Sequence, residues 1–202
     1  MTPPAAAEPP SVAARIGPNA VLQLAEALDE AGADTRAVFA AAGLTGHLDA
    51  PPTTMVPETD VIALYAALRR VAGEARAHAI ARDAGVRTAR YLLAHRIPRP
   101  AQAVLKALPP RLAARLLLTL IARHAWTFAG SSALEIGHGR PSRVVFADSP
   151  IARGATATAP VCDFYAGTFE GLFQALVAPR ASAHETACAA TGAPACTLSL
   201  TW

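Results

Sequence analysis

The chain has 202 residues and a mass of 20.8 kDa, which is enough for one well-buried domain but not for two. Hydrophobic residues make up 52% and charged residues 16%, so the chain is not disordered as a whole. The net charge of +3 comes from scattered arginines and not from a basic cluster interleaved with aromatic residues, so we expect no nucleic-acid partner. The most apolar stretch, 116–122, is too short to span a membrane.

The N-terminal residues and the cysteine count indicate the compartment and the start of the domain. Met1–Pro10 lacks a basic segment followed by an apolar core, so we expect no secretory signal and a cytoplasmic location. Three cysteines in a reducing compartment argue against disulfides and leave metal binding, a reactive thiol or core packing. Residues 1–17 are rich in Pro and Ala without periodicity, which predicts a disordered leader before a single domain at 18–202.

Helices are predicted through the first two-thirds of the chain. The apolar spacing after Pro18 indicates an amphipathic helix that ends at Gly32, and Asp34 can cap a short helix that stops at Gly43. A strong helix is expected from Pro57 to Val71, after a Pro/Thr-rich connector. Further helical stretches are expected at 74–95 and, after a break at 97–100, on both sides of Pro109-Pro110.

The last third of the chain changes to strand-like patterns. Between 134 and 146, apolar residues alternate with polar ones around a Gly139–Ser142 turn, which predicts a β-hairpin. A helix from about 159 to 178 follows, and strands are expected at 182–188 and 195–202. The fold class is therefore α+β, with a helical N-terminal two-thirds packed on one face of a small antiparallel sheet.

Four potential metal ligands lie in the C-terminal segment 160–202: Cys162, Glu185, Cys188 and Cys196. A structural zinc takes four ligands in a tetrahedron, mostly thiolates, from separate elements. Cys162 opens the long helix, and the other three flank a hairpin that can close onto the positive end of that helix. His184 is a competing ligand, but in a strand it points to the face opposite Glu185. Burial of the cysteines as small apolar side chains stays open as the alternative.

The same residues resemble the end of the 4-vinyl reductase domain family. The resemblance rests on Cys162, the Glu-Thr-Ala-Cys run at 185–188 and the Ala-Cys-Thr-Leu-Ser-Leu run at 195–200, with Met55–Glu58 and the hairpin fitting upstream. It covers 18–202 and implies a ligand-binding fold shared with sensor domains of aromatic-responsive transcriptional activators. A Cys, Glu, Cys, Cys set binds zinc in those sensor domains, which implies a structural zinc here on the four ligands named above.

The family name implies reduction of a tetrapyrrole vinyl group, which needs a nicotinamide, a flavin or an iron–sulfur electron source. No G-x-G-x-x-G follows a predicted strand, and cysteines that hold zinc cannot also hold an iron–sulfur cluster. A zinc closed by four protein ligands has no open position for catalysis. We therefore assign no catalytic residue and favour a binding role over an intrinsic reductase activity.

A binding role predicts an apolar slot for a magnesium tetrapyrrole between the helical layer and the sheet. His124 is the first candidate for the axial donor and His95 the second. The remaining candidates are Trp126 and Phe128 in the slot, and Arg87, Arg90, Arg96 and Arg99 opposite the ring carboxylates. The alternatives for these residues are structural histidines, core aromatics and a solvated arginine face.

Three functions follow from the resemblance, which is strongest to a free-standing family member of bacteriochlorophyll biosynthesis. The first is a protein that binds a vinyl-bearing magnesium tetrapyrrole, a porphyrin or chlorophyllide intermediate, and delivers it to magnesium chelatase or the Mg-protoporphyrin methyltransferase. The second is a true divinyl tetrapyrrole 4-vinyl (8-vinyl) reductase. The third is an effector sensor or adaptor that acts through protein contacts. Related domains pair through their helices, which implies a homodimer.

Overall fold

The computed structural model describes residues 14–202, so most of the predicted leader lies outside the described residues. Arg15–Ile16 form a short strand, β1, which pairs antiparallel with β2 at Val56–Pro57. The backbone N–H of Gly17 donates to the carbonyl of Thr127 at 2.7 Å. Regular structure therefore begins before the predicted start at residue 18, because a two-residue strand has no periodicity by which a sequence reveals it.

In the described residues, the N-terminal part of the fold consists of five helices. The predicted cap of the second is confirmed, since Asp34 Oδ1 accepts a hydrogen bond from the Ala37 N–H at 2.8 Å. Gly73, with φ of 77°, turns the chain sharply between the fourth and the fifth. The short third helix is a single turn that the sequence pattern does not predict. The five are α1 (Asn19–Glu30), α2 (Thr35–Ala41), α3 (Gly46–Asp49), α4 (Glu58–Ala72) and α5 (Glu74–His95).

Prolines divide the next helical stretch as predicted. Pro98 precedes α6 (Arg99–Ala107), and Pro109 precedes α7 (Pro110–Arg123), which a short 3₁₀ turn follows. Proline fits the start of a helix because the first N–H groups there have no helical partner. Within the described residues, none of the helices combines the length and apolar character that crossing a bilayer requires.

The C-terminal part forms a four-stranded antiparallel sheet in the order β3-β4-β6-β5. The predicted hairpin and both C-terminal strands are present, and α8 begins at residue 163, about four residues later than predicted. The elements are β3 (Leu134–Gly137), β4 (Ser142–Phe146), α8 (Asp163–Leu176), β5 (Ser182–Ala187) and β6 (Cys196–Thr201). The predicted α+β class, with helices packed on a small antiparallel sheet, is confirmed.

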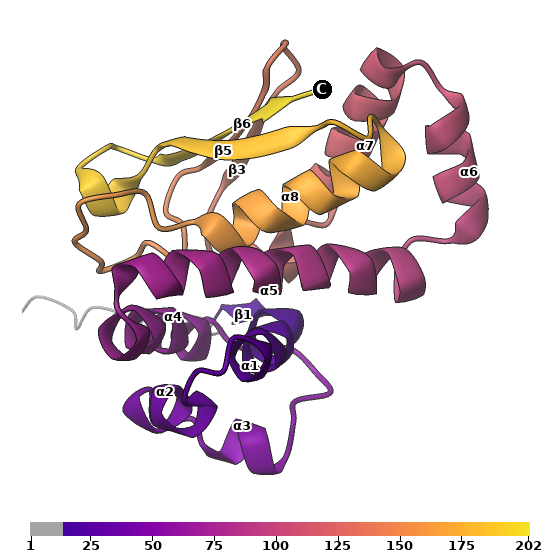
Figure 1. The fold of residues 1–202 in the computed structure, drawn as a ribbon. Helices are drawn as coiled ribbons and strands as arrows, with labels where there is room; N and C mark the ends of the chain where they lie inside the picture. Colours follow the sequence, from indigo (N-terminus) through magenta and orange to yellow (C-terminus); the bar gives the residue numbers. More distant parts are fainter. Residues whose placement is uncertain (1–13) are drawn as a thin grey trace, which may run out of the picture.

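The elements stack in layers, with the sheet on one side and α8 directly beneath it (Figure 1). α5 runs along the opposite side of α8, and α1 and α4 lie beyond α5. α5 and α8 touch through their backbones: a Cβ on Gly85 would lie 2.1 Å from the carbonyl oxygen of Phe164, and one on Gly167 would lie 2.3 Å from that of Arg82. These two helices therefore leave no room between them for a ligand.

Aromatic rings fill the space between α8 and the sheet. Tyr165 of α8 stacks on Phe146 of β4, with ring centroids 4.4 Å apart. Phe128 meets the edges of Phe146, Tyr165 and Phe169, each with centroids 6.3 Å apart. The slot predicted between the helical layer and the sheet is thus occupied by side chains at this place, because the few aromatic residues of this chain are used to pack the core.

Candidate functional site

The structure brings Cys162, Glu185, Cys188 and Cys196 together at one end of the sheet. Cys162 is the N-cap of α8, Glu185 lies in β5, Cys188 follows β5, and Cys196 begins β6. One ligand atom from each residue lies within 4.8 Å of the others. Three separate elements therefore converge on one point, as the sequence spacing predicts.

Short polar contacts order the four side chains. The Cys162 N–H donates to Glu185 Oε2 at 2.7 Å, and the Ala189 N–H donates to Cys196 Sγ at 3.3 Å. The Cys188 and Cys196 sulfurs are 3.7 Å apart, so the pair stands as free thiols in a closely spaced arrangement. Backbone donors aimed at a carboxylate and a sulfur favour the charged forms that a metal binds.

Glu185 carries the clearest sign of a cation-binding site. Its Oε1 is buried without a hydrogen-bond partner among the described residues. Burial raises the pKa of this carboxyl to about 8. A buried carboxylate oxygen without a partner is costly, and a bound cation would remove that cost. The side chains present therefore fit a metal ion.

The donor set also indicates which metal fits. Three thiolates and one carboxylate suit a tetrahedral zinc and would close its coordination shell with protein ligands. Hydrogen bonds to Cys188 and Cys196, together with burial, raise the pKa of Cys162, so a metal has to displace protons to bind. His184 is exposed on the opposite side of β5 from the cluster, as the strand alternation predicts.

A half-buried arginine, which the sequence analysis did not single out, lies beside the cluster. Arg69 of α4 donates to the Ile151 carbonyl at 3.2 Å. Burial lowers its pKa, and the nearby Cys162 and Cys188 oppose that shift. Three thiolates and a carboxylate around a divalent zinc would have a net negative charge, which a guanidinium at this place would offset. No sequence pattern reveals this role, since α4 is far from the cysteines along the chain.

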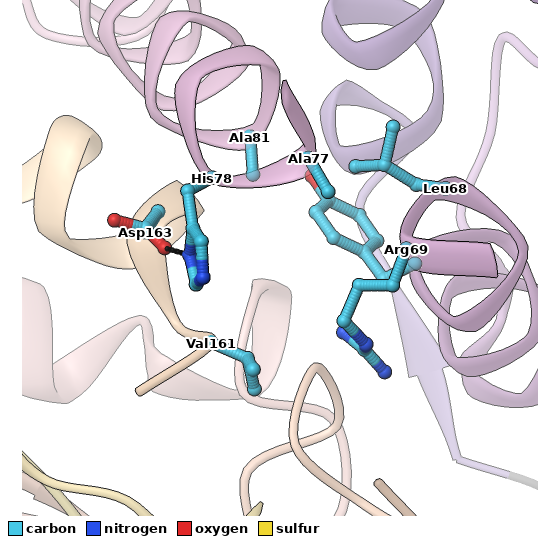
Figure 2. Close-up of a pocket in the computed structure, with 8 residues that line it drawn as sticks. Leu68, Arg69, Ala77, His78, Ala81, Val161 and Asp163 are labelled. Carbon is cyan, nitrogen blue, oxygen red and sulfur yellow. Dashed lines mark hydrogen bonds and ion pairs between the residues drawn. The ribbon is translucent and has the colours of Figure 1, made fainter. Parts of the chain in front are cut away.

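Arg69 also lines a small, partly open pocket between α4, α5 and the start of α8 (Figure 2). His78 and Asp163 meet across its edge with Nδ1 and Oδ2 2.6 Å apart. The pocket measures about 10 Å³, which is the size of a single water site. It is therefore too small for an organic ligand.

The predicted axial donors lie on the surface and bond to their own helices. The Nδ1 of His124 is 2.8 Å from the Leu120 carbonyl, and the Nδ1 of His95 is 3.1 Å from the Tyr91 carbonyl. The His95 ring stacks on the Tyr91 ring with centroids 4.6 Å apart. Both histidines are exposed, and neither lines a cavity described here.

The other predicted ligand residues are equally dispersed. Trp126 is 61% exposed, whereas Phe128 packs in the aromatic core. Arg87 is committed to ion pairs with Asp83 and Glu30, and Arg90 is exposed on α5. Arg96 and Arg99 are likewise exposed at the end of α5 and the start of α6. The predicted set does not converge, because it joined residues by their proximity in sequence and not by a shared face.

A surface cleft of about 310 Å³ lies elsewhere, between α7 and the β3–β4 turn. Arg111 and Arg115 line it from α7, and His138 and Arg140 line it from the turn. Trp202 also lines the cleft, and Arg140 Nη2 donates to the Trp202 carbonyl at 2.6 Å. None of these residues is among the predicted ligand residues. The available signal was the spacing of Arg111 and Arg115, which places both on one helix face.

Comparison with known proteins gives a family match and two close relatives. The 4-vinyl reductase domain family matches residues 143–201. The chain is 45% identical to the "Bacteriochlorophyll synthase 23 kDa chain" of Cereibacter sphaeroides over 194 residues, which are 95% of this chain and 92% of that protein. It is 39% identical to the protein of the same name from Rhodobacter capsulatus, over 90% of this chain and 84% of that one.

Among solved structures, the chain is similar to the phenol-responsive sensory domain of the transcription activator PoxR, determined with phenol. The identity is 18% and the TM-score 0.47, over 72% of this chain and 74% of that domain.

Proposed function

Because the chain belongs to the family of the bacteriochlorophyll synthase 23 kDa chain and carries a 4-vinyl reductase domain, we propose that it acts in bacteriochlorophyll biosynthesis as a tetrapyrrole-binding protein. It binds a vinyl-bearing tetrapyrrole intermediate and delivers it to a pathway enzyme, such as magnesium chelatase for the metal-free porphyrin or the Mg-protoporphyrin methyltransferase for the magnesium porphyrin. The observation that carries this proposal is the 45% identity over nearly the whole length of both chains. The resemblance to the 4-vinyl reductase domain family is confirmed by the same matches.

We further propose that Cys162, Glu185, Cys188 and Cys196 hold a structural zinc. The zinc would supply a fixed positive centre that ties the start of α8 to β5 and β6. Support comes from the closeness of the four ligand atoms, within 4.8 Å, and from the buried Glu185 oxygen without a partner among the described residues. Four protein ligands would leave the ion no open position, so its contribution is to folding and not to chemistry on a substrate.

The proposal is tested by titrating the purified protein with Mg-protoporphyrin and a divinyl chlorophyllide, followed by absorbance and fluorescence. The same titrations are repeated with NADPH present. The expected result is saturable binding with unchanged vinyl groups, checked by chromatography of the extracted pigment. Serum albumin at the same concentration controls for unspecific uptake of pigment.

The other outcomes separate the competing functions. Conversion of the divinyl to the monovinyl pigment would contradict a pure binding role and identify a reductase. Absence of saturable binding would overturn the proposal and favour an adaptor that acts through protein contacts. Binding without conversion supports delivery, which transfer of pigment from the loaded protein to the methyltransferase then measures.

A further inference from the structure

We infer that the cleft between α7 and the β3–β4 turn binds the carboxylate-bearing edge of the tetrapyrrole, an assignment that rests on the proposed function. The ligand class is a planar macrocycle that carries two or more carboxylates. Arg111 and Arg115 are the residues that recognise the carboxylates, and Trp202 is the apolar wall.

Positively charged side chains are concentrated at this cleft. Three arginines and His138 line it, no acidic side chain is among its lining residues, and the main-chain oxygen of Trp202 is contacted by Arg140 and not by Arg111 or Arg115. Arg111 and Arg115 are exposed and form no ion pair with any residue in 14–202. In contrast, Arg82, Arg87 and Arg153 are each paired with an acidic side chain. The cleft therefore attracts an anion, and paired guanidinium groups match the geometry of carboxylates.

The two arginines stand on one face of the helix. They are four residues apart on α7, and residues at this spacing are neighbours on the helix surface. Two guanidinium groups side by side repel each other weakly in water and bind a dianion together. A ligand with two carboxylates on one edge suits this arrangement better than a ligand with one.

The same cleft offers apolar surface for a planar ring. The guanidinium of Arg140 lies 4.8 Å from the Trp202 ring centroid, and the hydrogen bond from Arg140 to the Trp202 carbonyl holds this residue in place. The indole Nε1 of Trp202 is buried and has no acceptor among the described residues. Leu112, which is 54% exposed, lines the cleft from α7. A flat hydrophobic ring would cover the apolar surfaces of Trp202 and Leu112, and a polar group at its edge would accept from the Trp202 N–H.

The size of the cleft limits how the ligand sits. At about 310 Å³ it lies at the lower end of the range of small-molecule pockets, so it takes one edge of a four-ring macrocycle and not the whole. The rest of the ring would lie over the outer face of α7, where Leu116 is 38% exposed one turn after Leu112. Such partial enclosure is suited to release to another protein.

The test compares the double substitution Arg111→Gln/Arg115→Gln with a matched control, Arg123→Gln/Arg180→Gln. Both remove two exposed arginines, but Arg123 and Arg180 lie outside the cleft. Each protein is titrated with Mg-protoporphyrin and with its dimethyl ester, which lacks free carboxylates. We expect the Kd for Mg-protoporphyrin to rise about tenfold or more in the cleft variant only. The ester should bind the unsubstituted protein and the cleft variant equally.

The failures of the two proposals are distinguishable. If the unsubstituted protein binds neither pigment, both the proposed function and the assignment of the cleft as the binding site are wrong. If it binds Mg-protoporphyrin and the cleft variant binds equally well, only the assignment of the cleft is overturned. An equal loss in the control variant would show unspecific attraction and would also overturn it. Circular dichroism of both variants verifies that they remain folded, as substitution of exposed side chains predicts.

Discussion

Glu58 joins segments that are far apart in sequence through one buried carboxylate. It is 5% exposed, accepts from Ser131 Oγ at 2.9 Å and pairs with Arg153 Nη1 at 2.9 Å. Gly130 lies against it with φ of 60°, and a Cβ there would lie 2.6 Å from Oε1. In the sequence, Glu58 stands at the start of a predicted helix and within the run that resembles the 4-vinyl reductase domain family. Its role was not predictable because Ser131 is 73 positions away along the chain.

Replacement of Glu58 by Ala should lower the free energy of unfolding by about 2–3 kcal/mol, because it removes the buried carboxylate that Ser131 Oγ and Arg153 Nη1 contact and leaves Arg153 with its exposed partner Asp148. Urea denaturation measures this change. The matched control is Asp148→Ala, which removes the exposed partner of the same arginine and should cost less than about 1 kcal/mol. An equal loss of unfolding free energy in the two variants would show that the buried Glu58 contributes no more to stability than the exposed Asp148.

The proposed zinc site makes the metal content of the protein dependent on each of its four ligand residues. Cys188→Ser should abolish stoichiometric zinc, because oxygen replaces a thiolate in a set of four ligands. Elemental analysis of the purified protein measures the metal. His184→Ala, one residue from Glu185 but outside the cluster, should retain zinc fully. Retention of zinc by the Cys188 variant would remove this residue from the proposed site.

Helices and strands of ordinary length could be predicted from the sequence, whereas the shortest elements could not. Periodicity and proline breaks place α4 to α7 to within a few residues, because these signals are local. The β1–β2 pair has two residues per strand, so it carries no periodic signal, and its pairing joins residues from distant parts of the chain. Strands as short as β1 and β2 form only because the folded chain brings them together.

The close contact between α5 and α8 makes the stability of the protein sensitive to any side chain added at Gly85. Gly85→Ala should lower the free energy of unfolding by about 3 kcal/mol, because the new methyl group meets the backbone of α8 and cannot be relieved by a side-chain rotation. Thermal and urea denaturation measure the loss. Gly46→Ala is the control, since nothing lies within 4 Å of its Cβ position. This control should be neutral or stabilise the protein by up to about 1 kcal/mol.

For the whole molecule, the convergence of Cys162, Glu185, Cys188 and Cys196 could be predicted from the sequence, whereas the cleft beside α7 could not. Cys162, Glu185 and Cys188 are close enough in sequence for strand alternation and helix start to bring them together. The cleft needs α7, the β3–β4 turn and Trp202 to meet, and these segments come from three distant parts of the chain. His124 and Trp126 are predicted ligand residues because they are neighbours in sequence, but both side chains are exposed.

Removal of the proposed zinc should affect one part of the molecule more than another. A strong chelator is expected to raise amide hydrogen exchange in β5, β6 and the first turn of α8, which hold all four ligands or adjoin them. Exchange in α1 and α2 should change little, because these helices lie on the far side of α5. Uniform loss of protection would instead show that the molecule unfolds as a single unit without the metal.

The strand order has a consequence for how the chain reaches this structure during synthesis. β6 is made after β3, β4 and β5, yet it lies between β4 and β5 in the sheet. Until β6 has left the ribosome, the nascent β3–β4 hairpin and β5 have no strand to share, and Cys196 has not yet joined the cluster. The N-terminal helices can therefore assemble while translation continues, but the sheet forms only in a late, concerted step that completes the metal ligands as well.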